Sequence, residues 1–282
     1  MTQEDNFFFN MIEINKIYNI DCLYGMKMLE DKSIDLIVTS PPYDNLRAYN
    51  NNIDKNWNES TWKPIIKEMF RIMKDGGIVV WIVNDATING SETGTSFKQA
   101  LHFMDCGFKL HDTMIYNKVN PVPSSHNRYQ QTFEYMFVFS KGKPKTTNIL
   151  LEKRHNECND KRTVRIKRTN RDKNGEFGQP KLVNIKEMVP RRNIWTYKVG
   201  LYNSTSDKNA FQHPAIFPEK LVEDHILSWS NEGDLILDTF IGSGTTAKMS
   251  ILNKRNFIGF EINEEYYNIA LDRIKNLIKK DE

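Results

Sequence analysis

The chain has 282 residues, 39% of them hydrophobic and 27% charged, with a formal net charge of +3. This composition allows one domain with a large buried core plus an insertion. No stretch approaches the 18 apolar residues of a membrane span, and Phe7-Phe8-Phe9 is too short and lacks the basic flank of a signal peptide. Cys22, Cys106 and Cys158 match neither a disulfide framework nor a metal cluster, which predicts a cytoplasmic protein without a bound metal.

The first half of the chain alternates between strand and helix patterns. An asparagine-rich stretch at 45–58 predicts a mobile loop, Ser60 or Thr61 is the expected N-cap of the following helix, and residues 74–77 predict a turn. The predicted elements are a strand and a helix within 12–30, a strand at 34–38, a helix at 61–73, a strand at 78–83, a helix at 96–106, and strands at 108–117 and 133–140.

The stretch 141–193 separates this half from the rest and differs from it in charge. Residues 141–192 hold 16 basic and 6 acidic side chains, a net +10, so the remainder, with 23 basic and 30 acidic side chains, carries −7. Such a basic region can neutralise phosphates, although a solvated charged face is an equal alternative for any one run. The predicted elements beyond it are a helix at 219–229, a strand at 234–238, a helix at 245–253, a strand at 257–260 and a helix at 264–280.

A stiff loop follows the strand at 34–38. In Ser40-Pro41-Pro42-Tyr43 each proline fixes its own φ and biases the residue before it away from helix. The two prolines donate no amide hydrogens, so the backbone offers carbonyl oxygens, with a serine before them and an aromatic ring after. This loop is suited to hold a flat group that carries an NH2.

A glycine-rich loop follows the strand at 234–238. In Asp238-Thr239-Phe240-Ile241-Gly242-Ser243-Gly244-Thr245 the two glycines allow tight turning and close backbone approach at the start of a helix. Glu261 ends the next strand, 23 residues beyond Asp238, close to the roughly 20-residue spacing at which an acid binds ribose hydroxyls. No lysine follows the second glycine directly, which argues against a triphosphate ligand.

Together the two loops resemble the amino-methylating DNA methyltransferases, which use S-adenosyl-L-methionine. In that family a D/N/S-P-P-Y/F/W loop holds the target base and a strand ending in D-x-F-x-G-S-G-T holds the cofactor. Here the proline loop comes first, the permuted order of the β class. Ile20-Asp21-Cys22 is similar to the adenine-contacting stretch of the family, and residues 213–221 are similar to the segment that leads a helix into its cofactor site. The resemblance extends from about residue 17 to 274.

The resemblance implies a Rossmann-like, doubly wound α/β sheet of about seven strands, mainly parallel with an antiparallel edge strand. Its catalytic half would be 12–140, a small basic target-recognition insertion 141–193, and its cofactor-binding half 194–282. The implied catalytic residues are Ser40, Pro41, Pro42 and Tyr43, and the implied cofactor-binding residues are Asp21, Cys22, Phe217, Asp238, Phe240, Gly242, Ser243, Gly244, Thr245 and Glu261.

The residue types fit the chemistry of an exocyclic amine, whose lone pair is delocalised into the ring. Ser40 Oγ and the Pro41 carbonyl can accept its N–H groups and stabilise the charge that develops on it. Tyr43 would stack on the flipped base. Asp85 and Glu134 could assist but are expected to be structural, His126 and Arg128 to contact phosphate or solvent, and His213 to shape the cofactor pocket.

Serine at the first loop position favours cytosine N4 as the target over adenine N6. An RNA or protein amine methyltransferase, and a non-enzymatic nucleic-acid binder, stay open as alternatives. The expected partner is double-stranded DNA. A separate cognate restriction endonuclease and a homodimer are compatible with the sequence, which specifies neither.

Overall fold

The computed structural model describes residues 12–42, 57–121, 128–154, 164–167, 174–177, 181–184, 186–200 and 203–281. The described chain divides into two compact units, one made of the segments Met1–Asn148 and Asn193–Glu282 and the other of Ile149–Arg192. Tyr43, His126 and Cys158, and most of the loop predicted at 45–58, lie outside the described residues.

The larger unit is built on an eight-stranded sheet with the order β1-β14-β13-β2-β3-β7-β6-β12. Every neighbouring pair is parallel except the two that involve β7, which runs against β3 and β6. The strands are β1 (Lys16–Asn19), β2 (Ile34–Thr39), β3 (Met73–Val83), β6 (Lys109–Lys118), β7 (Phe133–Ser140), β12 (Ile194–Tyr197), β13 (Leu235–Asp238) and β14 (Asn256–Glu261). The predicted doubly wound class is confirmed, but the antiparallel strand β7 does not lie at the edge as expected, because β6 and β12 continue the sheet beyond it.

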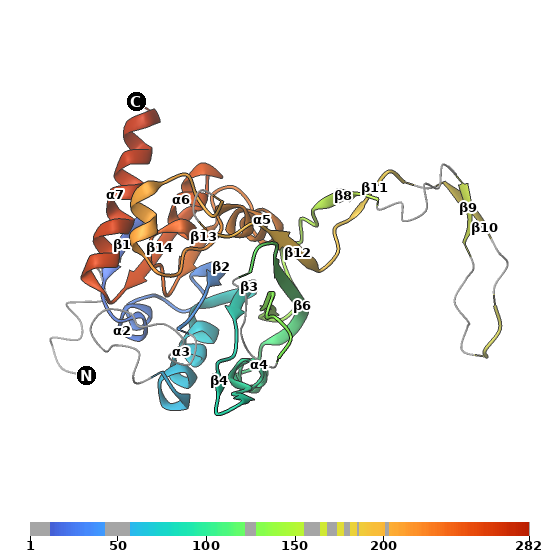
Figure 1. Ribbon diagram of the computed structural model, residues 1–282, viewed down its shortest axis with the longest axis horizontal. Helices are drawn as coiled ribbons and strands as arrows, with labels where there is room; N and C mark the ends of the chain where they lie inside the picture. The colour runs from blue at the N-terminus through green and yellow to red at the C-terminus, as the bar shows by residue number, and fades with distance from the viewer. Residues whose placement is uncertain are drawn as a thin grey trace. The chain divides into compact units, whose positions relative to one another are not determined.

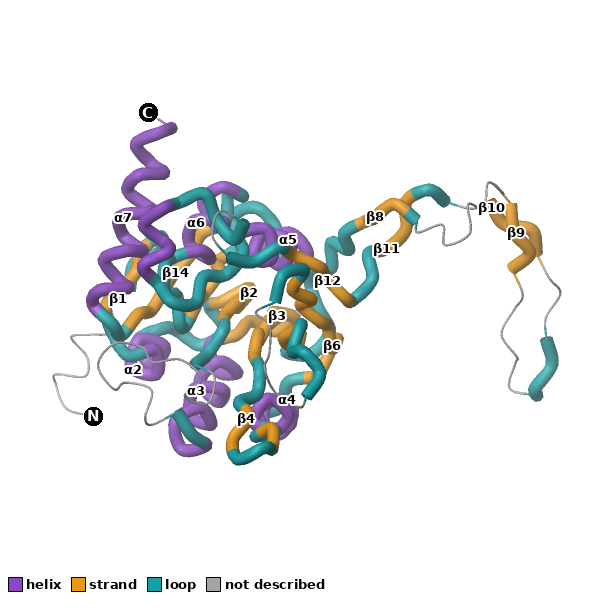
Figure 2. The backbone as a smooth tube through the Cα atoms, viewed as in Figure 1, coloured by secondary structure: helices purple, strands orange, loops and turns teal. Residues whose placement is uncertain are grey.

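Helices cover both faces of this sheet (Figures 1 and 2). Figure 1 shows one helical layer on one side and a second layer on the other. The first layer consists of α2 (Cys22–Lys27), α3 (Glu59–Ile72) and α4 (Thr95–Asp105), and the second of α5 (Glu219–Trp229), α6 (Thr245–Leu252) and α7 (Glu264–Asp281). None of the helices in the described part of the chain is long and apolar enough to cross a membrane.

The main core lies between the sheet and the first helical layer. Trp81 of β3 and Trp62 of α3 are each at most 1% exposed. Phe103 of α4 stacks on Phe139 of β7 with ring centroids 4.2 Å apart. Burial of aromatic and β-branched side chains on both faces fits the continuous apolar runs of the central strands.

The start of α3 differs from the prediction. Asn58, and not Ser60 or Thr61, is the N-cap, because its side chain accepts from the Ser60 amide while Thr61 Oγ1 accepts from the Asn58 amide. This reciprocal arrangement supplies two of the hydrogen bonds that the first turn of a helix cannot make internally.

The turn predicted at 74–77 is also wrong, because these residues belong to β3. The register between β2 and β3 shifts there: Ile34 pairs with Met73, but Leu36 pairs with Ile78. Gly76 has a φ of +84°, the left-handed conformation that allows the extra residues to bulge out of the ladder.

The smaller unit begins later than the insertion predicted at 141–193. Lys141 still belongs to the larger unit, since its ammonium donates to the carbonyls of Phe70 and Met73. Within Ile149–Arg192 the described strands form two antiparallel pairs, which are β8 (Leu151–Lys153) with β11 (Met188–Pro190) and β9 (Val164–Lys167) with β10 (Lys181–Asn184). Two more short strands, β4 (Thr87–Ile88) and β5 (Ser91–Glu92), form a hairpin in the larger unit.

Candidate active site

A cavity of about 880 Å³ lies where the parallel strands of the sheet end. Residues that follow β1, β2, β13 and β14 line it, together with part of the segment 199–218. From β13 the chain continues toward β14, whereas from the adjacent β2 it continues toward β3. The cavity therefore occupies the topological switch point, where doubly wound sheets bind their ligands.

Most of the predicted site residues meet in this cavity. Pro41, Asp238 and Gly244 are not part of its lining, and Tyr43 lies outside the described residues. The predicted residues that line it are Asp21, Cys22, Ser40, Pro42, Phe217, Phe240, Gly242, Ser243, Thr245 and Glu261.

Asp21 and Cys22 lie at the start of α2. The Asp21 carboxylate accepts from the Tyr24 amide at 3.1 Å and thereby caps this helix. Burial raises the pKa of the Cys22 thiol far above its ordinary value, so the thiol is neutral at any physiological pH. This corner of the cavity thus combines one charged acceptor with a small apolar surface.

Asp238 organises the glycine-rich loop from below. Its Oδ1 accepts from Thr39 Oγ1 at 2.6 Å and from the Phe240 amide at 3.0 Å, and its Oδ2 accepts from Thr246 Oγ1 at 2.6 Å. Burial raises the pKa of this carboxyl to about 6 despite these donors. The hydrogen bond to Thr39 connects β2, which carries the proline loop, directly to β13, which carries the glycine loop.

Both glycines of the glycine-rich loop have a positive φ, a backbone conformation that other residues rarely adopt. Gly242 has a φ of +48°, and a Cβ there would lie 2.9 Å from His213 Nε2. Gly244 has a φ of +82°, and a Cβ there would lie 3.0 Å from the Cβ of Ala270 in α7. The loop therefore needs glycine both for its backbone conformation and for the close approach of its neighbours.

Glu261 ends β14 at the wall of the cavity. Its Oε2 accepts from the Gly242 amide at 2.9 Å and its Oε1 from the Asn263 amide at 2.8 Å. Burial is the largest influence and raises the pKa of this carboxyl to about 7, with Asp238 adding repulsion. Because a carboxylate has about four acceptor positions, these amides leave capacity for a ligand hydroxyl.

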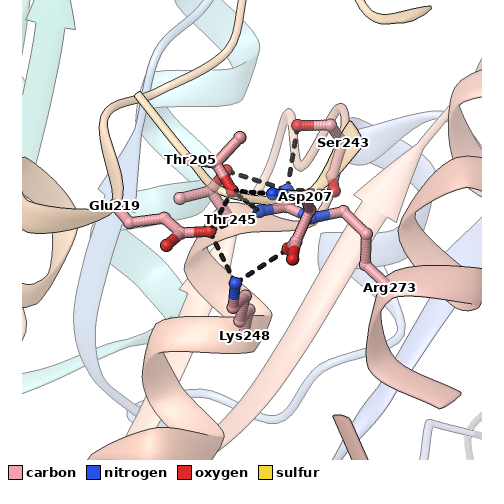
Figure 3. Close-up of polar contacts among 7 residues, drawn as sticks. All are labelled: Thr205, Asp207, Glu219, Ser243, Thr245, Lys248 and Arg273. Carbon is pink, nitrogen blue, oxygen red and sulfur yellow. Dashed lines mark hydrogen bonds and ion pairs between the residues drawn. The ribbon is translucent and has the colours of Figure 1, made fainter. Parts of the chain in front are cut away.

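A buried network of charged side chains contacts the glycine-rich loop (Figure 3). Arg273 of α7, whose side chain is 1% exposed, donates to the Ser243 carbonyl at 2.6 Å and to Thr245 Oγ1 at 3.1 Å. Its other nitrogens bind Asp207 and Glu219, and Lys248 of α6 binds the same two carboxylates at 2.8 and 2.7 Å. Two cations and two anions thus balance where the loop enters α6.

At the end of the cavity formed by β6 and β7, Lys118 and Glu134 form a close ion pair. Lys118 Nζ lies 2.5 Å from Glu134 Oε1 and 5.6 Å from the centroid of the Tyr116 ring. Asn120, which also lines this end, exchanges hydrogen bonds with the backbone of Val199.

The remaining polar candidates have structural contacts. Asp85 accepts from the Ser96 amide and from Ser96 Oγ, and thereby caps the first turn of α4. Arg128 donates to the Gly90 carbonyl and lies 3.6 Å from Glu92. His213 lines the cavity, and its Nδ1 accepts from the Ala215 amide; that it shapes a cofactor pocket stays a prediction.

The sequence interpretation missed several lining residues, namely Trp57, Lys118, Ile262, Asn263 and Tyr266. Lys118, Ile262 and Asn263 end or directly follow strands that point to the cavity, which is a signal that the predicted strands already contained. Trp57 packs edge-on against Phe240 at 5.5 Å. Its Nε1 is buried without a hydrogen-bond partner among the described residues.

These features together define a class of protein. A doubly wound sheet places a proline loop and a glycine-rich loop on neighbouring strands, with an acidic strand end and one shared cavity. This is the arrangement of a group-transfer enzyme that binds a nucleoside-containing cofactor next to a second, flat substrate.

Comparison with known proteins gives the family. The family model described as DNA methylase, of the N6/N4 type, matches residues 34–272. The orphan methyltransferase M.BamHII of Bacillus amyloliquefaciens is 55% identical over 249 residues, which cover 88% of this chain and 91% of that protein. The type II methyltransferase M1.MboII of Moraxella bovis is 29% identical, covering 92% of this chain and 96% of its own length.

Solved structures share the fold. The PvuII DNA methyltransferase, described as cytosine-N4-specific, superimposes with a TM-score of 0.68 at 20% identity and covers 92% of this chain and 85% of its own. The complex of M1.HpyAVI with S-adenosyl-L-methionine gives a TM-score of 0.58 at 24% identity, with coverage of 92% and 98%.

The chain belongs to the N6/N4 DNA methylase family. The predicted recognition of an amino-methylating DNA methyltransferase is confirmed, and so is S-adenosyl-L-methionine as its cofactor. The family includes enzymes of the N6 type and of the N4 type, so membership does not by itself distinguish cytosine N4 from adenine N6 as the target.

Proposed function

We propose that this protein transfers a methyl group to the N4 amine of a cytosine that is flipped out of duplex DNA. The observation that carries the proposal is the shared cavity, in which Ser40 of the proline loop faces the same space as Gly242 and Ser243 of the glycine loop. Serine at position 40 favours cytosine, and the cytosine-N4-specific PvuII enzyme supports the same base among the structural neighbours.

The residues of the cavity fit the cofactor. Glu261 has acceptor capacity for ribose hydroxyls, Asp21 and Cys22 offer a polar and an apolar surface for the adenine, and Gly242 leaves space that a side chain would fill. The unpartnered Nε1–H of Trp57 is one donor that a ligand in the cavity could satisfy. When bound, S-adenosyl-L-methionine supplies an electrophilic methyl group.

The role of Ser40 follows from its position in the cavity, whereas the roles of Pro41 and Tyr43 follow from the resemblance of the proline loop to that of the family. We assign Ser40 Oγ and the Pro41 carbonyl to accept the two N–H groups of the base, which localises the lone pair of the amine and stabilises its developing charge. Tyr43 would stack on the base. Asp238 is assigned to hold the loop rather than the cofactor, since Thr39, Thr246 and the Phe240 amide surround its carboxylate.

Mass spectrometry of nucleosides tests this proposal. Unmethylated duplex DNA is incubated with the full-length protein and methyl-labelled S-adenosyl-L-methionine, with RNA of the same sequence as a parallel substrate. Labelled N4-methylcytosine is the expected product. Labelled N6-methyladenine would overturn the choice of base but keep the mechanism, and label in RNA or protein alone would overturn the choice of substrate.

We further propose that the unit Ile149–Arg192 contacts the DNA. Its stretch of the sequence holds 13 basic and 6 acidic side chains, a net +7 in a chain whose total is +3, and binding through phosphate contacts releases counterions. Lys153 and Lys186 are exposed in this unit. Replacing both by glutamine should reduce the slope of log affinity against log salt by about 2, whereas the exposed Lys254 in the larger unit serves as a control that leaves the slope unchanged.

The cellular setting is part of the same proposal. We infer that the protein works in the cytoplasm and that any cognate endonuclease is a separate protein, because the assigned residues account for methyl transfer alone. A homodimer is testable by sedimentation of the purified chain with and without duplex DNA.

A further inference from the structure

The cavity has a charged end that the assigned roles do not use. Lys118 ends β6, and Glu134 lies near the start of β7. Both side chains are largely buried, at 21% and 8% exposure, and both line the cavity that contains Ser40. A buried ion pair is weak evidence for stability alone, because its desolvation opposes its attraction.

We propose that Lys118, held in place by Glu134, donates a hydrogen bond to the ring acceptor edge of the flipped base, formed by N3 and O2 in cytosine. The inference rests on the proposed function and adds a specificity-determining residue to it. Ser40 would hold the base at its amine, and Lys118 would hold it at the acceptors beyond the amine.

The sheet places the two residues at a suitable separation. Ser40 follows Thr39, which pairs with Trp81 of β3, and Glu134 precedes Tyr135, which pairs with Val83 of β3. The strands β2 and β7 are therefore separated by β3 alone, a lateral distance of about 10 Å. Lys118 starts from β6, one strand further, but its ammonium reaches back to Glu134 on β7. A hydrogen bond of about 3 Å at each side leaves room between Ser40 and this ammonium for one pyrimidine ring.

The chemistry of the pair suits an acceptor edge. An ammonium group has three donors and no acceptor, and Glu134 is the one carboxylate bound to it in the described structure. The Tyr116 ring, 5.6 Å away, further restrains it. Donors can thus point into the cavity, where the N3 and O2 acceptors of cytosine would meet them.

Glu134 has a second consequence for the reaction. The amine of the base gains positive charge as it attacks, and an isolated ammonium nearby would oppose that charge. The ion pair is neutral overall, so the site can offer a strong donor without adding a net positive charge. Glu134 is therefore a positioning residue rather than a group that touches the base.

Substitutions combined with base analogues test the assignment. After the methylated position has been mapped, duplexes carry at the target either cytosine, an analogue with C–H in place of N3, or an analogue without the O2 oxygen. Lys118→Met should lower kcat/KM on cytosine about 10- to 100-fold, the range for a hydrogen bond to a charged group. On at least one analogue the wild-type enzyme should already show this loss, and Lys118→Met should add little to it.

Matched variants separate this role from a structural one. Lys109→Met changes an exposed lysine at the other end of the same strand and should stay within about twofold of wild type. Lys118→Arg keeps a charged donor and should restore part of the activity on cytosine. Binding of S-adenosyl-L-methionine, measured by calorimetry, should be unchanged in all three variants.

The outcomes are distinguishable. Equal losses for Lys118→Met on cytosine and on both analogues, or no loss at all, would overturn the assignment of Lys118. If the wild type labels adenine, the choice of cytosine fails, and the same cycle with an adenine that lacks N1 decides the role of Lys118. If the wild type labels no DNA, the proposed function fails together with the inference that depends on it.

Discussion

The pKa of Glu261 predicts how cofactor binding depends on pH. With a pKa of about 7 in the free protein, this carboxyl is half protonated at neutral pH. Ribose hydroxyls donate to the ionised form, so binding requires the deprotonated group. If only that form binds, the apparent affinity should rise about tenfold between pH 6 and pH 8.

Calorimetric titration with S-adenosylhomocysteine measures this effect without methyl transfer and without the charge of the sulfonium. Glu261→Gln keeps the shape of the side chain but cannot ionise, so it should bind more weakly and lose most of the pH dependence. Histidine is the residue type that ordinarily changes charge near neutral pH, and His213 lines the cavity, so His213→Asn serves as the control and should keep the dependence. A flat wild-type profile, or an unchanged slope in Glu261→Gln, would refute the reasoning.

The remaining predictions concern the two loops. Ser40→Ala should lower kcat about 100-fold while cofactor affinity stays within twofold, and equal loss of both would contradict its catalytic role. Gly244→Ala should lower the free energy of unfolding by more than Gly233→Ala, because Gly233 also has a positive φ but has open space around it. If denaturant titrations gave similar losses of about 1–2 kcal/mol for both variants, the close approach of α7 to Gly244 would be contradicted. Arg273→Met should cost about 3–5 kcal/mol in the same titrations because it leaves buried carboxylates uncompensated, against at most about 1 kcal/mol for Lys63→Met at an exposed pair; a loss no larger than that control would contradict the network.

The central elements were predictable because their signals are local. The strands predicted at 34–38, 78–83 and 133–140 are short apolar runs rich in β-branched or aromatic residues. They correspond to β2, β3 and β7, and the observed ends differ from the predicted ones by at most one residue, except that β3 begins five residues earlier. The glycine loop was recognisable because its conformation demands glycine at two fixed positions. Such features are determined by residues that are close together in the sequence, so they can be predicted from the sequence alone.

The parts of the fold and of the site that could not be predicted from the sequence depend on contacts between distant segments. β12 has only four residues, and it forms a strand because it pairs with β6, almost 80 positions earlier. The charge network joins Asp207, Glu219, Lys248 and Arg273, each of which looks like a surface residue in its own segment. A period of two or 3.6 residues indicates which face of an element is buried, but not which other element covers it.

The charges of the cavity suggest how the site distinguishes cofactor from product. Among the described lining residues, Asp21, Glu134 and Glu261 are acidic and Lys118 is basic, so the formal charge of the wall is −1 with Glu261 protonated and −2 once Glu261 is ionised. The substrate form of the cofactor carries a positive sulfonium, and the product form has lost that charge. The carboxylates therefore favour the substrate form. Arg273 and Lys248 do not oppose this preference, because Asp207 and Glu219 neutralise them behind the loop.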